Sequence, residues 1–206
     1  MMDYHTHHIV PQGGYLNAVT RADWASIAAA PKQMIPCFGQ HPWHAEGVDV
    51  GEYAFELDEW LSRYPQADVG ESGLDASPRW KDSLDAQRVL LQVHMGAAFR
   101  QDRMIHLHGV QAWSELLEIL RQRFRCGTLP RVLLHGWNGS HEMAREFLAL
   151  GVIFSVGLRE LSSAKAEQRY GRIPADRLFA ESDDEPESWA RTVALLGMLR
   201  GGLSGA

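Results

Sequence analysis

Short hydrophobic runs alternate with longer runs of helical periodicity along most of this chain. This alternation is typical of β–α units built around a parallel sheet or barrel. Seven or eight strands are expected, and the first connection, residues 11–30, has the least regular pattern, with a Gly-Gly turn and an alanine-rich stretch. The predicted strands are 2–7, 34–39, 67–71, 103–108, 131–135, 152–156 and 178–181.

The longer runs place apolar side chains on one face of a helix. We interpret these stripes as core positions without a cofactor role. Ser140 is predicted to cap its helix and Gly151 to end it, and Pro186 is predicted to open the last helix. The predicted inner faces are Leu57, Trp60, Leu61 and Tyr64; Ala86, Leu90, Val93 and Ala97; Met143 and Phe147; and Trp189, Val193 and Leu196.

The length of 206 residues fits one domain, 1–206, in which residues 201–206 are predicted to be a loose tail. Hydrophobic residues make up 45% of the chain and charged residues 22%, which is ordinary for a globular protein. No apolar run approaches the ~18 residues that cross a bilayer, and the N-terminus lacks the basic and apolar halves of a signal peptide. We therefore expect no membrane association and a cytoplasmic location.

Cysteine content and net charge argue against two classes of protein, cysteine-stabilised scaffolds and nucleic-acid binders with a basic face. Cys37 and Cys126 are too few for a disulfide scaffold or a cysteine zinc site, and both are expected to be reduced. The formal net charge of −6 argues against a protein that holds nucleic acid by a broad basic face. Two bound divalent cations would offset most of this charge and would attract phosphate locally.

The first predicted strand contains an unusual polar pattern. Asp3, His5 and His7 alternate, so the two-residue period of a strand sends their side chains to one face, while His8 points away. A lone His-x-His near a terminus is more often a solvated edge than a pair of metal ligands. This segment alone is therefore weak evidence for a metal site.

Acidic and histidine residues recur at the carboxyl ends of the later predicted strands, where barrel enzymes assemble their active sites. Taken singly, such a residue is more often a satisfied hydrogen-bonding group than a ligand. Their joint occurrence favours a metal site, and imidazole and carboxylate without thiolate suit zinc, manganese, iron or magnesium. The residues concerned are Glu71, His106, His108, His135 and Asp183.

Six short segments surround these residues: DYHTHH, GQHPWH, GESGLD, LHGVQAWSELL, LLHGWNGSHEMAREFLALGVIFSVG and DRLFAESDDEP. In this order they resemble the TatD family of metal-dependent hydrolases, within the amidohydrolase-like barrels, over residues 3–189. The resemblance implies an α/β fold with a single TIM-type (β/α) barrel, seven or eight parallel strands and outer helices. The barrel would be contracted, because eightfold barrels typically need ~250 residues.

The resemblance also implies a site for two divalent metal ions, which would be zinc, magnesium or manganese. Glu71 would lie between the ions, and Glu71 and Asp183 would be the catalytic residues. His106 competes with His108 because both face the same side of a strand; we favour His108 because the segment after it fits the family better. The implied ligands are His5, His7 and Asp183 on one ion, His108 and His135 on the other, and Glu71 on both.

Further residues are assigned to the surroundings of the metals. His41 resembles a substrate-contacting histidine, although it could equally be a histidine that caps the turn before Pro42. Trp137 and Asn138 are expected to form the pocket wall. Asp75 is expected to orient a metal ligand, as such outer carboxylates do, and Asp3 is assigned the same role.

The sequence departs from the family where many relatives have H-x-R after the fourth strand. This chain has His108-Gly109-Val110, so an arginine that could hold phosphate is missing there. Arg79 and Lys81 are the basic residues that we expect to contribute phosphate contacts in its place.

The implied activity is hydrolysis of DNA phosphodiesters, from a 3′ end, by a two-metal mechanism with a bridging hydroxide and with Asp183 accepting a proton. DNA would be bound transiently, and a monomer is favoured. One alternative is an amide, lactone or aminoacyl-ester hydrolase on the same two-metal site, because loops decide the chemistry of a barrel. An inactive metal-binding module that serves a partner protein is a second alternative.

Overall fold

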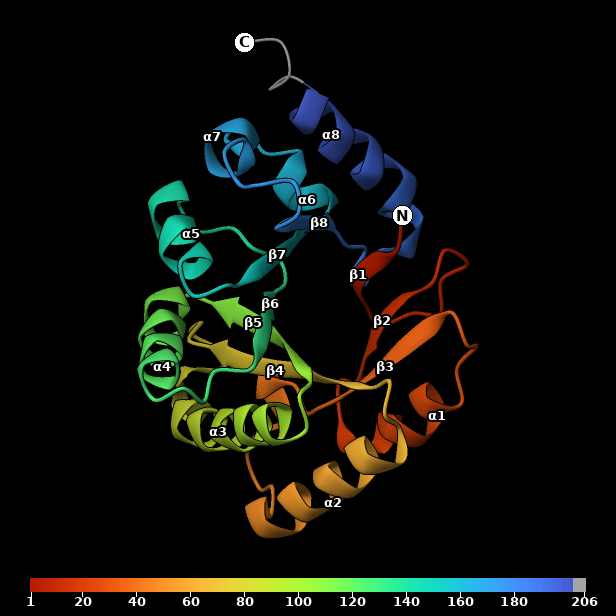
Figure 1. The fold of residues 1–206 in the computed structure, drawn as a ribbon, viewed down its shortest axis with the longest axis vertical. Helices are drawn as coiled ribbons and strands as arrows, with labels where there is room; N and C mark the ends of the chain where they lie inside the picture. The colour runs from red at the N-terminus through yellow and green to blue at the C-terminus, as the bar shows by residue number, and fades with distance from the viewer. Residues whose placement is uncertain (202–206) are drawn as a thin grey trace.

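Consecutive parallel strands form the centre of the protein. In the computed structural model, which describes residues 1–201, an eight-stranded sheet pairs in chain order. Helices surround it on the outside (Figure 1). The strands are β1 (Asp3–Thr6), β2 (Gly14–Asn17), β3 (Met34–Phe38), β4 (Asp68–Asp75), β5 (Met104–Val110), β6 (Arg131–Leu134), β7 (Ile153–Val156) and β8 (Leu178–Ala180).

The first and last strands meet and nearly close the sheet. Thr6 and Asp183 form a parallel bridge just beyond β8. The amide of Asp183 donates to the carbonyl of His5 at 2.9 Å, and the amide of His7 donates to the carbonyl of Asp183 at 3.3 Å. This nearly closed barrel confirms the predicted TIM-type fold.

Eight α-helices and four short 3₁₀ turns connect the strands of the described residues. The 3₁₀ turns are η1 (Arg21–Asp23), η2 (Pro42–His44), η3 (Lys81–Ser83) and η4 (Pro186–Ser188). The helices are α1 (Trp24–Ala28), α2 (Val50–Arg63), α3 (Leu84–Arg100), α4 (Trp113–Arg125), α5 (His141–Leu148), α6 (Leu158–Leu161), α7 (Ala166–Tyr170) and α8 (Trp189–Gly201).

Local signals explain several helix ends. The Ser140 side chain accepts from the amide of Met143 at 3.2 Å, which confirms Ser140 as the N-cap of α5. Gly151 has a φ of 82° and lies in the turn that leads to β7. Pro186 opens the turn η4, which continues into α8, so the helix itself begins later than predicted.

The predicted helical stripes all belong to the hydrophobic core or pack against it. Leu57, Leu90, Phe147 and Leu196 are buried. The helix α4 buries Trp113, Leu116, Leu117 and Leu120. No apolar face was predicted for this helix. These contacts join the helices to the outer face of the barrel and leave its interior for the polar residues described below.

Of the eight strands, β2 is the one that was not predicted from the sequence pattern. It is four residues long and lies in the irregular first connection, 11–30. No helix separates it from β1, and a side-chain carbon at Gly14 would lie 2.7 Å from Asp3 atoms, so only glycine permits this close pairing. Part of the contraction of this barrel therefore lies in the omitted helix between β1 and β2.

Three predictions concern the extent and environment of the chain. The predicted tail, 201–206, lies outside the described residues except for Gly201, which ends α8. Among residues 1–201 no helix has both the length and the apolar character of a membrane span. The assignment of 1–206 to one domain stays a prediction.

A buried histidine outside the barrel makes the stability of the fold sensitive to acid. His94 of α3 lies between the hydroxyls of Tyr53 and Ser72, with nitrogen–oxygen distances of 2.7 Å to each. A neutral imidazole has one donor and one acceptor nitrogen and so bonds to both hydroxyls. Burial lowers the pKa of His94 from 6.5 to about 3.

We expect the free energy of unfolding to fall as the pH is lowered from about 6.5 towards 3. In this window the unfolded chain binds a proton at His94 and the folded chain does not, a difference of about 1.4 kcal/mol per pH unit. Urea unfolding of His94→Gln across this range should show a weaker pH dependence than the wild type. His44→Gln, at an exposed site, is the control. Parallel curves for the wild type and His94→Gln would contradict the assignment.

Candidate metal centre

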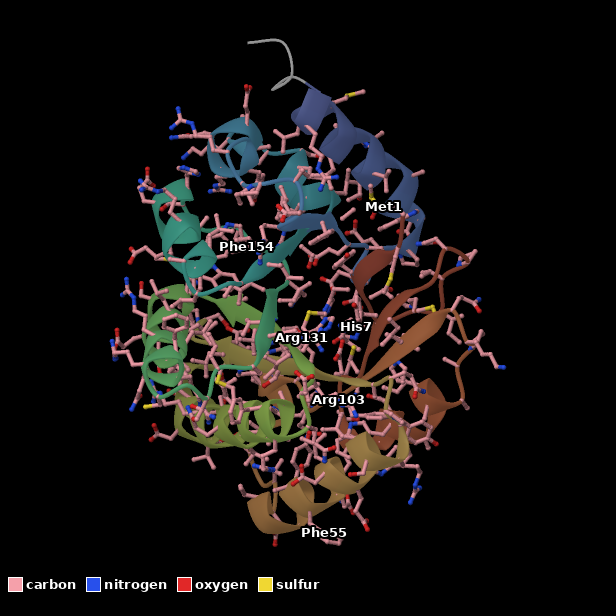
Figure 2. All side chains as sticks on the ribbon, viewed as in Figure 1. Met1, His7, Phe55, Arg103, Arg131 and Phe154 are labelled. Carbon is pink, nitrogen blue, oxygen red and sulfur yellow. The ribbon has the colours of Figure 1, made fainter. Side chains whose placement is uncertain are left out.

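The first strand and the residue that follows it supply His5 and His7 to the barrel interior. Asp3 and His5 are fully buried, whereas Tyr4 points outward and stacks on Phe179 of β8 with ring centroids 3.8 Å apart. This alternation is the one predicted from the two-residue period of a strand. His7 follows the end of β1 and continues the same face; it lies in the middle of the barrel (Figure 2).

Glu71 of β4 is the central residue of the site. Its carboxylate is 1% exposed, and its two oxygens face different histidines. Oε2 lies 3.4 Å from His5 Nε2 and 3.1 Å from His7 Nε2. Oε1 faces three further imidazole nitrogens at 3.2, 3.0 and 2.9 Å, which belong to His41, His108 and His135.

Close approach of the backbone around Glu71 requires glycine at two positions. A side-chain carbon at Gly70 would lie 2.4 Å from Asn17 Oδ1, and one at Gly39 would lie 2.5 Å from the carbonyl oxygen of Glu71. These glycines begin the segments GESGLD and GQHPWH. Their small size therefore allows β3 and β4 to bring His41 and Glu71 together.

Asp183 approaches the same site from beyond β8. Its Oδ1 lies 3.7 Å from His5 Nε2 and 3.6 Å from His7 Nε2, and its side chain is 45% exposed. Alternation along a strand does not distinguish Asp183 from its neighbour Asp184. The strand ends at Ala180, and Asp183 has a left-handed φ of 50°, so a turn directs its side chain. Asp184 is exposed and also borders the pocket.

The donor atoms suit divalent cations. Within residues 1–201, three groups of mutually close donors occur: His5 with Glu71 and His135; His5 with His7 and Asp183; and His41 with Glu71 and His108. Ligands bonded to one zinc ion at about 2.0–2.1 Å stand about 3.0–3.4 Å apart, close to the spacing around Glu71. Glu71 Oε1 and the ring nitrogens of His5 have polar neighbours but make no well-directed hydrogen bond within residues 1–201. Oε1 and the unprotonated nitrogen of His5 therefore remain available for a cation.

Metal binding needs carboxylates and neutral imidazoles, and the surroundings of Glu71 and His5 favour these forms. Burial alone would raise the pKa of Glu71, but the nearby His41 and His135 hold it well below its usual range. Burial lowers the pKa of His5 well below its usual value. Burial acts in the same direction on His7, but the adjacent Glu71 outweighs it and raises the pKa of His7 to about 9. His7 would therefore release a proton when a cation binds.

Asp75 and Glu181 lie behind two of the histidines. Asp75 Oδ2 is 3.7 Å from Nε2 of His108, and Glu181 Oε1 is 3.8 Å from Nδ1 of His135. Glu181 is buried and held by the amide of Gly136 at 2.8 Å and by the hydroxyl of Ser155. An orienting role was predicted for Asp75 but not for Glu181. Glu181 is the last residue of a predicted strand, so it could have been found by the same strand-end position that singled out Glu71.

The carboxylate of Asp3 accepts hydrogen bonds from main-chain amides rather than from a histidine ring. Its Oδ1 accepts from the amides of His5 at 3.2 Å and Ser182 at 3.1 Å. Burial raises the pKa of Asp3 to about 6. Asp3 therefore links β1 to the segment that ends in Asp183, and it acts on the site through the backbone.

The structure separates His106 from His108. His106 is buried deeper in the barrel, where Nε2 lies 3.8 Å from Cys37 Sγ and the ring packs 4.8 Å from that of Tyr15. Among the described residues, His106 belongs to none of the three donor groups, whereas His108 does. The geometry thus favours His108 over His106 as a candidate ligand.

A pocket of about 360 Å³ opens above the donor atoms. Its wall includes Trp43, His108, His135, Asn138, Arg159 and Asp183.

The expectation that Trp137 lines this pocket is wrong. Trp137 is fully buried, and its ring packs between Trp113 and Phe154, with centroid distances of 4.9 and 5.0 Å. Asn138 is exposed and does border the pocket, with Oδ1 accepting from Trp113 Nε1 at 3.0 Å. Of these two adjacent residues, only Asn138 reaches the opening.

Val110 stands at the position of the missing arginine and borders the pocket. Arg159 reaches the same pocket from α6, and its Nε donates to Glu160 Oε1 at 2.8 Å. A guanidinium therefore borders the site from a different strand end.

Comparisons with known proteins agree with this geometry. A family model described as TatD related DNase matches residues 8–191. Human deoxyribonuclease TATDN3 is 25% identical over 166 residues, which cover 73% of this chain and 57% of that protein. The uncharacterized metal-dependent hydrolase YjjV of Escherichia coli K12 is 27% identical over 208 residues, 89% of this chain and 76% of YjjV. This chain thus spans little more than half the length of TATDN3.

Solved structures show the same fold. The crystal structure of YjjV superposes with a TM-score of 0.82 at 23% identity, covering 96% of this chain and 89% of that chain. A TatD family hydrolase from Entamoeba histolytica has a TM-score of 0.70 at 18% identity, covering 84% of this chain and 60% of that chain. At these identities the likeness shows the barrel fold alone.

Proposed function

This chain belongs to the family of TatD related DNases, and we propose that it hydrolyses phosphodiester bonds of DNA with the help of two divalent metal ions. The observation that supports this most is the placement of Glu71. Its Oε2 faces His5 and His7, and its Oε1 faces a separate set of histidines. One carboxylate with donors on both sides is suited to bridging two cations.

We assign the ligands from these two sides. His5, His7 and Asp183 would hold one ion, and His108 and His135 would hold the other, with Glu71 shared. His41 lies as close to Glu71 as the other histidines do, so it either completes the second ion or contacts the substrate beside it. The imidazoles suit zinc, and the carboxylates also suit manganese or magnesium.

The protein residues would position the phosphodiester and move the proton. Bound divalent cations would supply an activated water near neutral pH and would stabilise charge on the phosphate oxygens. Asp183, which is exposed to the pocket beside His5 and His7, would accept a proton from the attacking water. Arg159, which lines the same pocket, would contact the phosphate, and Arg79 and Lys81 would contribute beyond the pocket.

The experiment that tests this function is product analysis on end-labelled single-stranded DNA. Protein loaded with zinc or manganese should release mononucleotides from the 3′ end, and 3′-blocked DNA should be resistant. Amide, lactone and aminoacyl-ester substrates form the comparison panel. Hydrolysis of one of these, with DNA left intact, would replace our proposal by the alternative hydrolase. The cytoplasmic location and the monomeric state stay predictions.

Metal content gives a second, independent prediction. Elemental analysis of protein purified without chelator and titrated with zinc should approach two ions per chain. His108→Gln should reduce the content towards one, because it removes a ligand from only one side of Glu71. His106→Gln, a buried histidine of the same strand, is the matched control and should retain two. Saturation of the wild type at one ion, unchanged in His108→Gln, would indicate a mononuclear site.

A further inference from the structure

An exposed aromatic side chain stands at the edge of the metal pocket. Trp43 of η2 is 42% exposed, although Trp24 and Trp137 are almost completely buried. It borders the pocket together with His108, and the centroids of these two rings are 6.2 Å apart. Part of the Trp43 indole therefore lies open to solvent directly beside the candidate ligands.

The orientation of Trp43 is fixed from several directions. Its indole Nε1 donates to Asp75 Oδ2 at 2.7 Å, and its ring meets that of His41 edge to face at 4.4 Å. Trp80 stacks against it with ring centroids 5.4 Å apart and planes inclined by only 12°. The guanidinium of Arg79 lies 4.8 Å from the centroid of the Trp80 ring and extends the stack.

We propose that Trp43, supported by Trp80 and Arg79, is a stacking platform for the nucleobase adjacent to the phosphodiester that is cleaved. This inference rests on the proposed function, because it assumes that the pocket holds a phosphodiester of DNA. The occupant is a base of a single strand, since a base paired inside a duplex does not offer its face to a side chain.

The chemistry of the platform indicates how it would select substrate. Every nucleobase has a π-face, so stacking on an aromatic ring tolerates any sequence. The only indole N–H group of Trp43 already donates to Asp75 and is not available to read a base edge. The platform should therefore favour substrates with a base at this position without distinguishing the four bases.

The platform also supplies binding energy that an acidic protein cannot obtain from a broad basic surface. The formal net charge is −6, which argues against a broad basic surface as the source of affinity. Stacking adds affinity without positive charge. Because the Trp43 ring is already held by Asp75, His41 and Trp80, little side-chain entropy remains to be lost when a base binds.

The test combines a change in the protein with a change in the substrate. Wild type, Trp43→Leu and Trp43→Phe are compared on single-stranded oligonucleotides that either carry the 3′-terminal bases or have tetrahydrofuran abasic residues there. For the normal oligonucleotide, Trp43→Leu should lower kcat/KM by about five- to a hundredfold, the range for loss of one stacked base. Abasic DNA should be cleaved equally by Trp43→Leu and the wild type, and Trp43→Phe should recover most of the loss.

Two further variants separate stacking from other effects. Trp80→Leu removes the supporting ring without touching Asp75 and should give a smaller loss that is again confined to the normal oligonucleotide. Phe55→Leu is the matched control, because Phe55 is 66% exposed and lies on α2, far from His7 (Figure 2). It should behave as the wild type on both substrates. Zinc content should be unchanged in all variants.

Failure of the platform and failure of the proposed function give different results. If the wild type cleaves normal and abasic DNA equally, or Trp43→Leu loses the same factor on both, no base stacks there and Trp43 only positions Asp75.

If the wild type cleaves neither, the nuclease proposal fails. The dissociation constants of labelled oligonucleotides, measured by fluorescence anisotropy in chelator, then test the platform alone. Equal affinity of wild type and Trp43→Leu for the normal strand would overturn it.

Discussion

Replacement of Asp183 by asparagine is expected to lower turnover by about 10²- to 10⁴-fold at saturating metal, the range for loss of a general base. Asparagine keeps the shape and one ligating oxygen but cannot accept a proton. Asp183 lies 3.6 Å from His7 Nε2 and is also open to the pocket, so it is placed to contact both a cation and a water. Metal affinity should fall only modestly. Single-turnover cleavage of end-labelled DNA, with metal content measured in parallel, is the appropriate experiment.

The backbone conformation of Asp183 should allow asparagine to replace it without destabilising the fold. Its φ of 50° lies in the left-handed region, which asparagine tolerates as well as aspartate does. The bridge between Thr6 and residue 183 involves only main-chain atoms. We therefore expect Asp183→Asn to retain the wild-type melting temperature, so that a loss of turnover reports chemistry rather than unfolding.

Asp184→Asn is the paired control. Asp184 is exposed and borders the same pocket, but it belongs to none of the donor groups among the described residues. It should lose little activity, although its neighbour loses most. The reverse result, a silent Asp183→Asn and an inactive Asp184→Asn, would show that the turn after β8 directs the other carboxylate to the metals and that our ligand assignment is wrong there.

The sequence predicted those parts of the site that depend on strand periodicity. The alternation of Asp3, His5 and His7 has one geometric solution once the segment is a strand, and the structure shows that solution. Glu71, His108 and His135 follow apolar runs that can only be interior strands, so their meeting at one end of a barrel follows from the parallel topology. The fold and the gathering of these residues were therefore predictable.

What the sequence could not predict depends on turns and on contacts between distant segments. The strand β2 is short and contains few apolar residues, so its pairing is decided by neighbours rather than by its own pattern. Trp137 and Asn138 are adjacent in sequence, yet one is fully buried and the other is exposed. The stack of Trp43 on Trp80 joins two loops, and nothing in either loop indicates the other.

Replacement of Glu71 by glutamine should have the largest effect on the site, because it changes both sides at once. Five imidazole nitrogens lie within 3.4 Å of its two oxygens. Glutamine preserves volume but removes the negative charge and replaces one oxygen by an NH₂ group, which donates and cannot ligate a cation. Whichever way the amide is oriented, one set of histidines faces that group. We therefore expect zinc content to fall below two ions per chain and turnover to fall at least as far as in Asp183→Asn.

Glu181→Gln is the matched control for this last prediction, because it also neutralises a buried carboxylate near His135. Glu181 lies behind the ring of a single histidine, so its loss should weaken metal binding by about 10- to 100-fold, the usual effect of an outer partner, and leave two sites that fill at high zinc. Equilibrium dialysis against zinc, with near-UV circular dichroism to verify folding, distinguishes the two variants. If Glu71→Gln binds two ions with wild-type affinity, Glu71 does not bridge them, and the two-sided arrangement of histidines around it must have another purpose.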